Sequence, residues 1–214
     1  MNTSRAVVLA CVLTGVTCPA MRVVAQEPAF KFEITPFGGH RFGGELEQAD
    51  GDGELELDES HSQGIVLNIA ARIDGHWEIL YARQDTTMST RSLLPGDPRL
   101  DVDIEYWHFG GNYAFEDDDS RPFLAFTLGV SRLDPYPPDL RAETYPSASI
   151  GGGWQLRSTK KVGVRIEGRV YTTFVDDDSA VFCRSTDGAG VCGFAIDSAT
   201  LTQWEARAGL VFRF

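Results

Sequence analysis

The chain has 214 residues, a formal net charge of −12 and four cysteines. A chain this acidic is not expected to bind nucleic acid, because its surface repels the phosphate backbone. No linker or low-complexity stretch separates a second domain, and no convincing helix-period segment follows the first 25 residues. Composition and patterning therefore favour a single all-β domain.

The N-terminal segment has the features of a secretory signal peptide. Arg5 precedes an apolar run over 6–13, and small residues at 23–25 have the spacing that a signal peptidase recognises. The apolar run is too short to span a bilayer as a helix. We therefore expect a cleaved signal peptide over 1–25 and one exported domain over 26–214.

The exported part is a series of eight runs in which apolar and polar residues alternate. Successive side chains of a strand point to opposite faces, so each run is a strand with two chemically different faces. Each apolar band is close to the roughly nine to eleven residues that a tilted strand needs to cross a bilayer. The apolar faces are expected to carry Phe30, Phe32 and Ile34; Ile65, Leu67, Ile69, Ala71 and Ile73; Trp77, Ile79 and Tyr81; Leu100, Val102, Ile104 and Tyr106; Pro122, Leu124, Phe126, Leu128 and Val130; Ala148, Ile150, Gly152, Trp154 and Leu156; Val162, Val164, Ile166 and Val170; and alternate residues from Trp204 to Phe214.

One segment breaks the alternation. Between Tyr106 and Tyr113 the aromatic residues fall on both faces. A β-bulge at the glycines in this segment would move the later aromatic residues to the apolar face. In the other arrangement, Trp107 and Phe109 point to the inside. The sequence is compatible with both.

The connections between the runs alternate in length. Transmembrane β-barrels have tight turns at one end and longer loops at the other. An even number of strands then places both termini at the end with the short turns. Short connections lie at 74–76, 116–120 and 158–160, and longer ones lie around 43–58, 88–98, 134–143 and 176–198.

The last run helps to distinguish between two possible environments of the apolar face, a protein core and lipid. A soluble sandwich would turn that face to its core, whereas a transmembrane barrel would turn it to lipid and keep the charges of the other face in its lumen. Those charges are Glu205, Arg207 and Arg213. The chain also ends in the pattern polar-x-Gly-x-x-aromatic-x-aromatic, which is formed by Arg207, Gly209, Phe212 and Phe214.

This ending resembles the C-terminal sorting signal of bacterial outer-membrane barrels, and the patterning of the exported chain is similar to that of small OmpA-type and OmpX-type barrels. The resemblance implies an all-β, eight-stranded antiparallel up-and-down transmembrane β-barrel in a Gram-negative outer membrane. It also implies the outer-membrane assembly machinery, outer-membrane lipid and lipopolysaccharide as partners. It does not imply one activity, because this group includes adhesins, defence proteins, narrow channels and lipid-modifying enzymes.

The polar faces of the strands define the expected lumen. Eight strands give an interior that side chains just fill. Opposite charges should pair across it, because an unpaired buried charge is costly. We expect this network to hold the barrel shut, and the alternative is a selective lining for small solutes or ions. The expected members are Lys31, Glu33, Arg72, Glu78, Asp101, Asp103, Glu105, Arg165, Glu167, Arg169, Glu205, Arg207 and Arg213.

Cys183 and Cys192 are the cysteines that remain after removal of the signal peptide. They lie close together in a segment rich in Asp, Ser and Gly. In an exported protein this spacing predicts a disulfide that closes a loop and stabilises by roughly 2–3 kcal/mol. A metal site is not expected there, because two thiols do not complete a ligand set.

No catalytic, cofactor or metal site is predicted. The acidic stretch 50–59 fails as a calcium loop, because Leu55 stands where glycine is required. Solvated loop tips, or loose binding of divalent cations, explain it better. His61 and Ser62 are adjacent and point to opposite faces of a strand, so they cannot act together as base and nucleophile.

We therefore expect a monomeric barrel with a structural or surface-interaction role, no cofactor, and long loops that contact a surface ligand. A narrow porin-like channel is the second reading. A lipid-modifying enzyme and a soluble lipocalin-like binding protein are less favoured. A lipocalin-like barrel would reverse the two faces, with an apolar pocket inside and the charges outside.

Overall fold

The structure is a computed structural model that describes residues 32–47, 54–71, 75–90, 99–115, 120–136, 142–157, 161–175, 180–186, 189–195 and 200–214. The predicted signal peptide lies outside these residues, as do Lys31 and Arg72 of the predicted lumen set. Every regular element in the described ranges is a β-strand. These ranges contain no helix that is long and apolar enough to cross a membrane.

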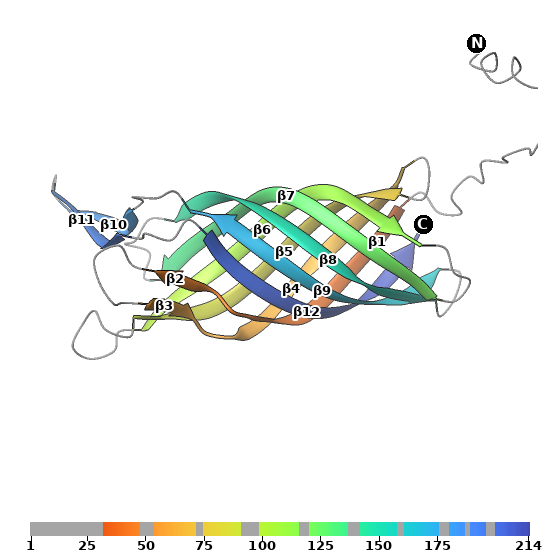
Figure 1. Ribbon diagram of the computed structural model, residues 1–214, viewed down its shortest axis with the longest axis horizontal. Coiled ribbons are helices and arrows are strands. Elements are labelled where there is room, and N and C mark those ends of the chain that lie inside the picture. Colours follow the sequence, from red (N-terminus) through yellow and green to blue (C-terminus); the bar gives the residue numbers. More distant parts are fainter. Residues whose placement is uncertain are drawn as a thin grey trace, which may run out of the picture.

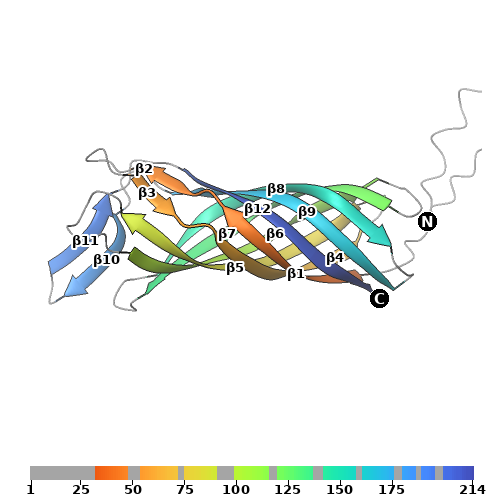
Figure 2. The ribbon, with the colours of Figure 1, turned by 90° about the horizontal axis from the view of Figure 1, so that it is seen from below.

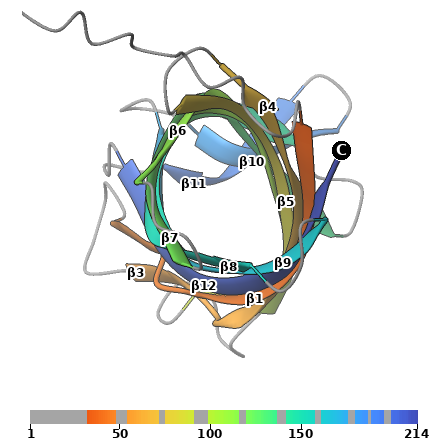
Figure 3. The same ribbon diagram turned by 90° about the vertical axis from the view of Figure 1, so that its right-hand side faces the viewer.

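Eight long strands form a closed antiparallel barrel (Figure 1), which Figure 3 shows end-on. Neighbours in the chain are neighbours in the sheet, and the pairing of β1 with β12 completes the circle. Closure leaves no strand edge unpaired, which a membrane requires. The predicted eight-stranded up-and-down barrel is thereby confirmed. Its strands are β1 (Phe32–Phe42), β4 (Ser60–Ala70), β5 (Gly75–Thr90), β6 (Arg99–Ala114), β7 (Ser120–Tyr136), β8 (Glu143–Arg157), β9 (Val162–Phe174) and β12 (Thr200–Arg213).

Two hairpins occupy the longer connections. β2 (Glu45–Glu47) pairs with β3 (Glu54–Leu57), and β3 also pairs with β5. β10 (Ala180–Thr186) and β11 (Ala189–Ala195) form a separate two-stranded sheet. All four short strands lie at the end of the barrel away from the C-terminus (Figures 1 and 2). Because long loops of membrane barrels face the exterior, we name this the outer end and the opposite one the periplasmic end.

The outside of the barrel carries an apolar belt. On β7, Leu124, Phe126 and Leu128 are 54–56% exposed, and Thr127 between them is fully buried. On β12, Leu210 is likewise exposed and Val211 is buried. Apolar side chains outside and polar side chains inside are the polarity of a membrane barrel, so the lipocalin-like reading is wrong.

β6 is regular along its whole length. Its pairing with β5 continues without a bulge from Gly75 opposite Tyr113 to Ser89 opposite Arg99. Trp107 and Phe109 nevertheless lie outside, each 55% exposed. The expected outward placement of these aromatic residues is therefore confirmed, but the bulge and the inward alternative are wrong. The strand has the opposite facing to the one assigned from Leu100 to Tyr106.

The facing of β6 corrects part of the predicted lumen set. Asp101, Asp103 and Glu105 point outward, whereas Val102 and Ile104 are buried inside. The reason is that the outer ends of the strands extend beyond the apolar belt. Water surrounds the barrel there, so charged residues face out and apolar residues fill the interior, as in a soluble protein.

Candidate functional site

The middle of the lumen is an ion-pair network centred on two glutamates. Glu167 on β9 accepts hydrogen bonds from Nε of Arg165 at 2.8 Å and from Nε of Arg169 at 2.7 Å. Nη2 of Arg207 lies 2.8 Å from the same carboxylate. Glu78, across the barrel on β5, pairs with Arg165 at 3.1 Å and with Arg169. All five side chains are buried, because alternate residues of β5, β9 and β12 point inward.

Glu205 connects this network to a second cluster nearer the outer end. Its Oε1 accepts a hydrogen bond from Arg41 at 2.9 Å, and its Oε2 accepts one from the Tyr171 hydroxyl at 2.8 Å. The Arg41 guanidinium lies 4.7 Å from the ring centroid of Tyr171 and 4.9 Å from that of Tyr106. A fully buried arginine is thus held by one carboxylate and two aromatic faces.

Arg41 is a lumen residue that was not predicted from the sequence. The apolar alternation that predicts β1 stops near Thr35, because the next outward positions are Pro36, Gly38 and His40. The strand nevertheless continues to Phe42. Extending the same parity past Thr35 would have placed Arg41 inside the barrel.

A third cluster lies toward the periplasmic end. Nε of Arg213 donates a hydrogen bond to Glu33 at 2.8 Å, and the Gln155 amide donates one to the same carboxylate at 3.2 Å. All three side chains are buried. Ionic and amide contacts therefore occur at three levels of the lumen, around Glu205, Glu167 and Glu33.

His108 belongs to a buried group of hydroxyls. One ring nitrogen lies 2.8 Å from Oγ of Ser147, and the other lies 3.0 Å from Oγ1 of Thr127 and 3.2 Å from Oγ of Ser149. Arg169 donates a hydrogen bond to Ser149 at 2.8 Å. The histidine and its hydroxyl partners are at most 3% exposed, so a substrate has no access to them.

An apolar seal closes the outer end of the interior. Leu57 reaches it from β3, whose position is fixed by a hydrogen bond from the Leu57 N–H to the Gly44 carbonyl at 2.9 Å. The neighbouring Asp58 N–H donates to the Thr87 carbonyl at 2.8 Å. The seal was not predicted from the sequence, because the apolar face of β6 was expected to point outward. We define the apolar seal as Leu57, Met88, Val102, Ile104, Leu133 and Leu201, each at most 3% exposed.

The charges displaced from the predicted lumen form a polar collar outside the seal. Nη2 of Arg83 lies 2.7 Å from Asp103, and its Nε lies 2.9 Å from Asp85. Burial raises the pKa of Asp103 and the nearby Asp85 carboxylate adds to this effect, while Arg83 opposes it. Exposed pairs of this kind contribute about 0–1 kcal/mol each. The collar is therefore a solvated rim and not part of the lumen network.

The structure brings together most of the predicted lumen residues. Asp101, Asp103 and Glu105 are excluded by the facing of β6. The buried ionic residues in the described part of the chain are five arginines and four glutamates, so their charges nearly cancel. They are Arg41, Arg165, Arg169, Arg207, Arg213, Glu33, Glu78, Glu167 and Glu205.

The residues of the predicted sorting signal lie along the seam between β12 and β1. Phe212 and Phe214 face outward, and the Phe214 ring stacks on Phe32 with centroids 5.3 Å apart. A Cβ at Gly209 would lie 2.6 Å from the Pro36 carbonyl oxygen, so only glycine allows the two strands to approach there. Arg207 points into the lumen.

Cys183 on β10 and Cys192 on β11 are direct cross-strand partners. Their side chains lie outside the described residues, so the disulfide stays a prediction. In the described ranges, no group of three His, Cys, Asp or Glu side chains could hold a metal ion.

No known protein family and no curated protein sequence matches the chain. Solved structures do match its fold. Neisserial surface protein A aligns with a TM-score of 0.59 and 14% identity over 88% of this chain and 100% of its own. The outer membrane protein OprG from Pseudomonas aeruginosa aligns with a TM-score of 0.58 and 10% identity over 87% and 96%. The outer membrane protease OmpT from Escherichia coli reaches a TM-score of 0.47 at 8% identity, over 89% and 100%.

The first two alignments share the barrel fold with this chain, and identities this low carry no activity from one protein to another. The closed barrel, the apolar belt and the charged interior agree with that fold. The chain is an integral β-barrel protein of the bacterial outer membrane.

Proposed function

We propose that this protein is a closed outer-membrane barrel with a structural and surface-interaction role, and that its outer hairpins contact a ligand at the cell surface. The observation that supports the proposal is a lumen blocked twice, by the apolar seal and by the ion-pair network below it. A barrel blocked in this way is poorly suited to conduct solutes or ions through its lumen. The loops that a rigid scaffold presents are then the natural place for recognition.

The hairpins β2–β3 and β10–β11 are the parts of the chain that support surface contact. The β10–β11 hairpin lies beyond the barrel strands at the outer end, and the β2–β3 hairpin lies beside the outer end of β5, with which β3 pairs (Figure 2). To test the role, residues 184–191 are replaced by a Gly/Ser segment of equal length in protein expressed on Escherichia coli. Adhesion of these cells to cultured epithelial cells is compared with that of cells carrying the unchanged protein.

The expected result is loss of adhesion with an intact barrel, which still migrates faster on gels when unboiled. Unchanged adhesion with an intact barrel would contradict a role for the β10–β11 hairpin. A barrel that no longer shows heat-modifiable migration would report a folding defect, and the shorter replacement of 187–188 alone would then be used.

We also propose that the protein is not an enzyme. His108 lies in the lumen, where it and its serine partners are enclosed by the barrel wall. His40 and His61 lie outside, where His40 contacts Glu59 at 3.4 Å, and no serine or cysteine nucleophile in the described ranges contacts either ring by a hydrogen bond. Hydrolytic activity of the purified protein on a casein or phospholipid substrate would contradict this.

A narrow channel is the second candidate, and the charged side chains that line the lumen at several levels, from Glu33 to Glu205, are the observation that favours it. Planar bilayer recordings separate the two functions. A closed barrel gives at most rare and small openings, whereas steady conductance that changes with Glu205→Ala would identify a channel.

A further inference from the structure

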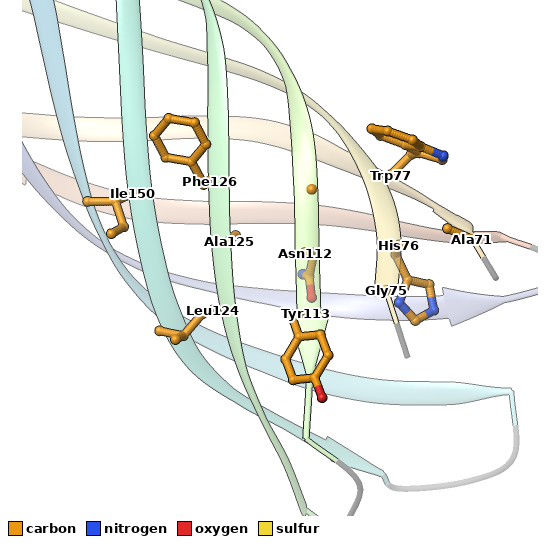
Figure 4. A pocket seen from close by; sticks show the side chains of 11 residues that line it. Ala71, Gly75, His76, Trp77, Asn112, Tyr113, Leu124, Ala125, Phe126 and Ile150 are labelled. Atoms are coloured by element: carbon orange, nitrogen blue, oxygen red, sulfur yellow. The ribbon is translucent and has the colours of Figure 1, made fainter. Parts of the chain in front are cut away.

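A hollow of about 430 Å³ lies near the periplasmic end, over β5, β6, β7 and β8 (Figure 4). Its large side chains are Trp77, Tyr113, Leu124, Phe126 and Ile150. These five side chains are 49–58% exposed, whereas the residues next to them in the strands point inward. The hollow therefore opens to the outside of the barrel and is separate from the lumen network.

The hollow exists because Gly111 has no side chain. Gly111 on β6 stands directly between Trp77 on β5 and Phe126 on β7 in the register of the sheet. The two rings lie on either side of β6 in Figure 4. Trp77 also stacks on Phe109, with centroids 5.4 Å apart. This contact holds the Trp77 ring in place on one side of the hollow.

The backbone does not require a glycine at 111. A Cβ there would meet only the His76 carbonyl oxygen, at 3.9 Å, and the residue does not adopt a positive φ. The neighbouring Gly110 is different, because a Cβ at that position would collide with the Phe126 carbonyl oxygen. Gly110 thus serves strand packing, whereas the effect of Gly111 is the hollow itself.

The height of the hollow along the barrel axis determines which leaflet of the membrane surrounds it. Gly111 precedes Phe115, the last described residue before the short connection 116–119, by four residues. At about 3.4 Å per residue and a tilt of about 40°, it lies roughly 10 Å above the periplasmic end. The apolar band of such a barrel is about 25 Å tall, so the hollow is within the inner leaflet.

We propose that this hollow binds one acyl chain of a phospholipid from the inner leaflet of the outer membrane. It is continuous with the apolar belt, which already contacts lipid. His76 and Asn112 also border the hollow, but the surface that lines it is almost all apolar. Inside a bilayer the driving force is dispersion, because a void leaves its lining without partner atoms. A flexible chain can fill the space between two fixed rings, and a chain held there exchanges more slowly than lipid against a smooth face.

The test compares Gly111→Leu with Gly168→Leu. Gly168 is also a lipid-facing glycine with nothing within 4 Å of a Cβ, but its cross-strand partners are Gly152 and Ala206, which form no walls. Both variants gain the same side chain in the same membrane. Only the first one fills the hollow.

The probe is phosphatidylethanolamine with dibrominated acyl chains, mixed with the unbrominated lipid in vesicles. Trp77 is the single tryptophan of the reporter protein, with the other three changed to phenylalanine. Bound lipid at the hollow quenches Trp77 fluorescence more strongly at low bromolipid fraction than random mixing of lipids around the barrel does. The excess quenching is expected in the parent reporter and in Gly168→Leu, and it is lost in Gly111→Leu.

Quenching that follows random mixing in the parent reporter would overturn the proposal and leave ordinary boundary lipid only. Equal excess quenching in all three proteins would also overturn it, because the lipid would then bind elsewhere. Heat-modifiable migration is measured for each protein to verify the fold. If Gly111→Leu does not fold, Gly111→Val replaces it.

Discussion

Glu167 is the side chain on which the lumen network depends most. Three arginines on two strands contact its carboxylate at 2.7–2.8 Å. A buried charge pair of this kind contributes little compared with an apolar core, but removing one partner leaves the other uncompensated. The alternation of β9 and β12 specifies which residues point inward, and the pairing of opposite charges then fills the interior.

Glu167→Gln is expected to lower the free energy of unfolding by about 3–5 kcal/mol, because the arginines keep their positive charges and lose their anionic partner. Urea unfolding in detergent or lipid vesicles, followed on gels by heat-modifiable migration, measures the change. Asp134→Asn is the control, since Asp134 pairs with Arg132 on the solvated side and should change stability by at most about 1 kcal/mol. Equal effects of the two substitutions would mean that the lumen is hydrated enough to screen its charges.

Leu210 gives a test of the membrane face. It is 52% exposed near the middle of the β12 belt that runs from Trp204 to Phe214. Leu210→Arg is expected to destabilise by about 2–4 kcal/mol, because the charge enters hydrocarbon. Thr202→Arg, on the same face of the same strand but beyond Trp204, should be close to neutral. A similar cost at both positions would place the membrane boundary elsewhere.

Among the strands, β3 contributes to the closure of the outer end. This short strand pairs with β5 and carries Leu57 into the apolar seal. The seal lies above the lumen network, so the two barriers are in series. Each one alone should block the passage of ions.

Leu57→Ala is expected to lower the free energy of unfolding by about 2–5 kcal/mol, as for other buried leucines. Planar bilayers containing this variant should still show no steady current, because the charged network remains in place. Combining it with Glu205→Ala is expected to produce a measurable leak. A steady current from Leu57→Ala alone would show that the seal is the only barrier.

The β10–β11 hairpin has the register that a disulfide needs. Direct cross-strand partners in an antiparallel pair have Cα atoms about 4.5–5.5 Å apart, within the range of disulfides. Cys183 and Cys192 are such partners. The purified exported protein is therefore expected to show no free thiol when denatured without reductant, and two after reduction, by thiol titration. Two free thiols before reduction would exclude the bond.

In the whole molecule, the polarity of the interior changes along the barrel axis. Where lipid surrounds the strands, the inside is charged and the outside apolar. Toward the outer end, Val102 and Ile104 fill the inside, while Asp103 and Glu105 face water. Whether lipid or water surrounds a strand determines which of its faces is apolar. The alternation of inward and outward side chains therefore continues unchanged along β6, while the apolar residues move from the outward to the inward positions.

The sequence by itself determined the fold class, the facing of seven of the eight barrel strands and most of the lumen charges. Period-2 alternation carries that information wherever lipid is on one side and a polar interior on the other, as at Leu210 and Glu205. On β6 the alternation alone does not tell which face is outside. An apolar residue points to lipid in the membrane zone, whereas at the outer end an apolar residue such as Ile104 points to the interior. Only the tertiary structure, through the unbroken register of β6 with β5, decided between them. The hollow at Gly111 was equally out of reach, since it depends on residues of four strands that only the closed sheet brings side by side.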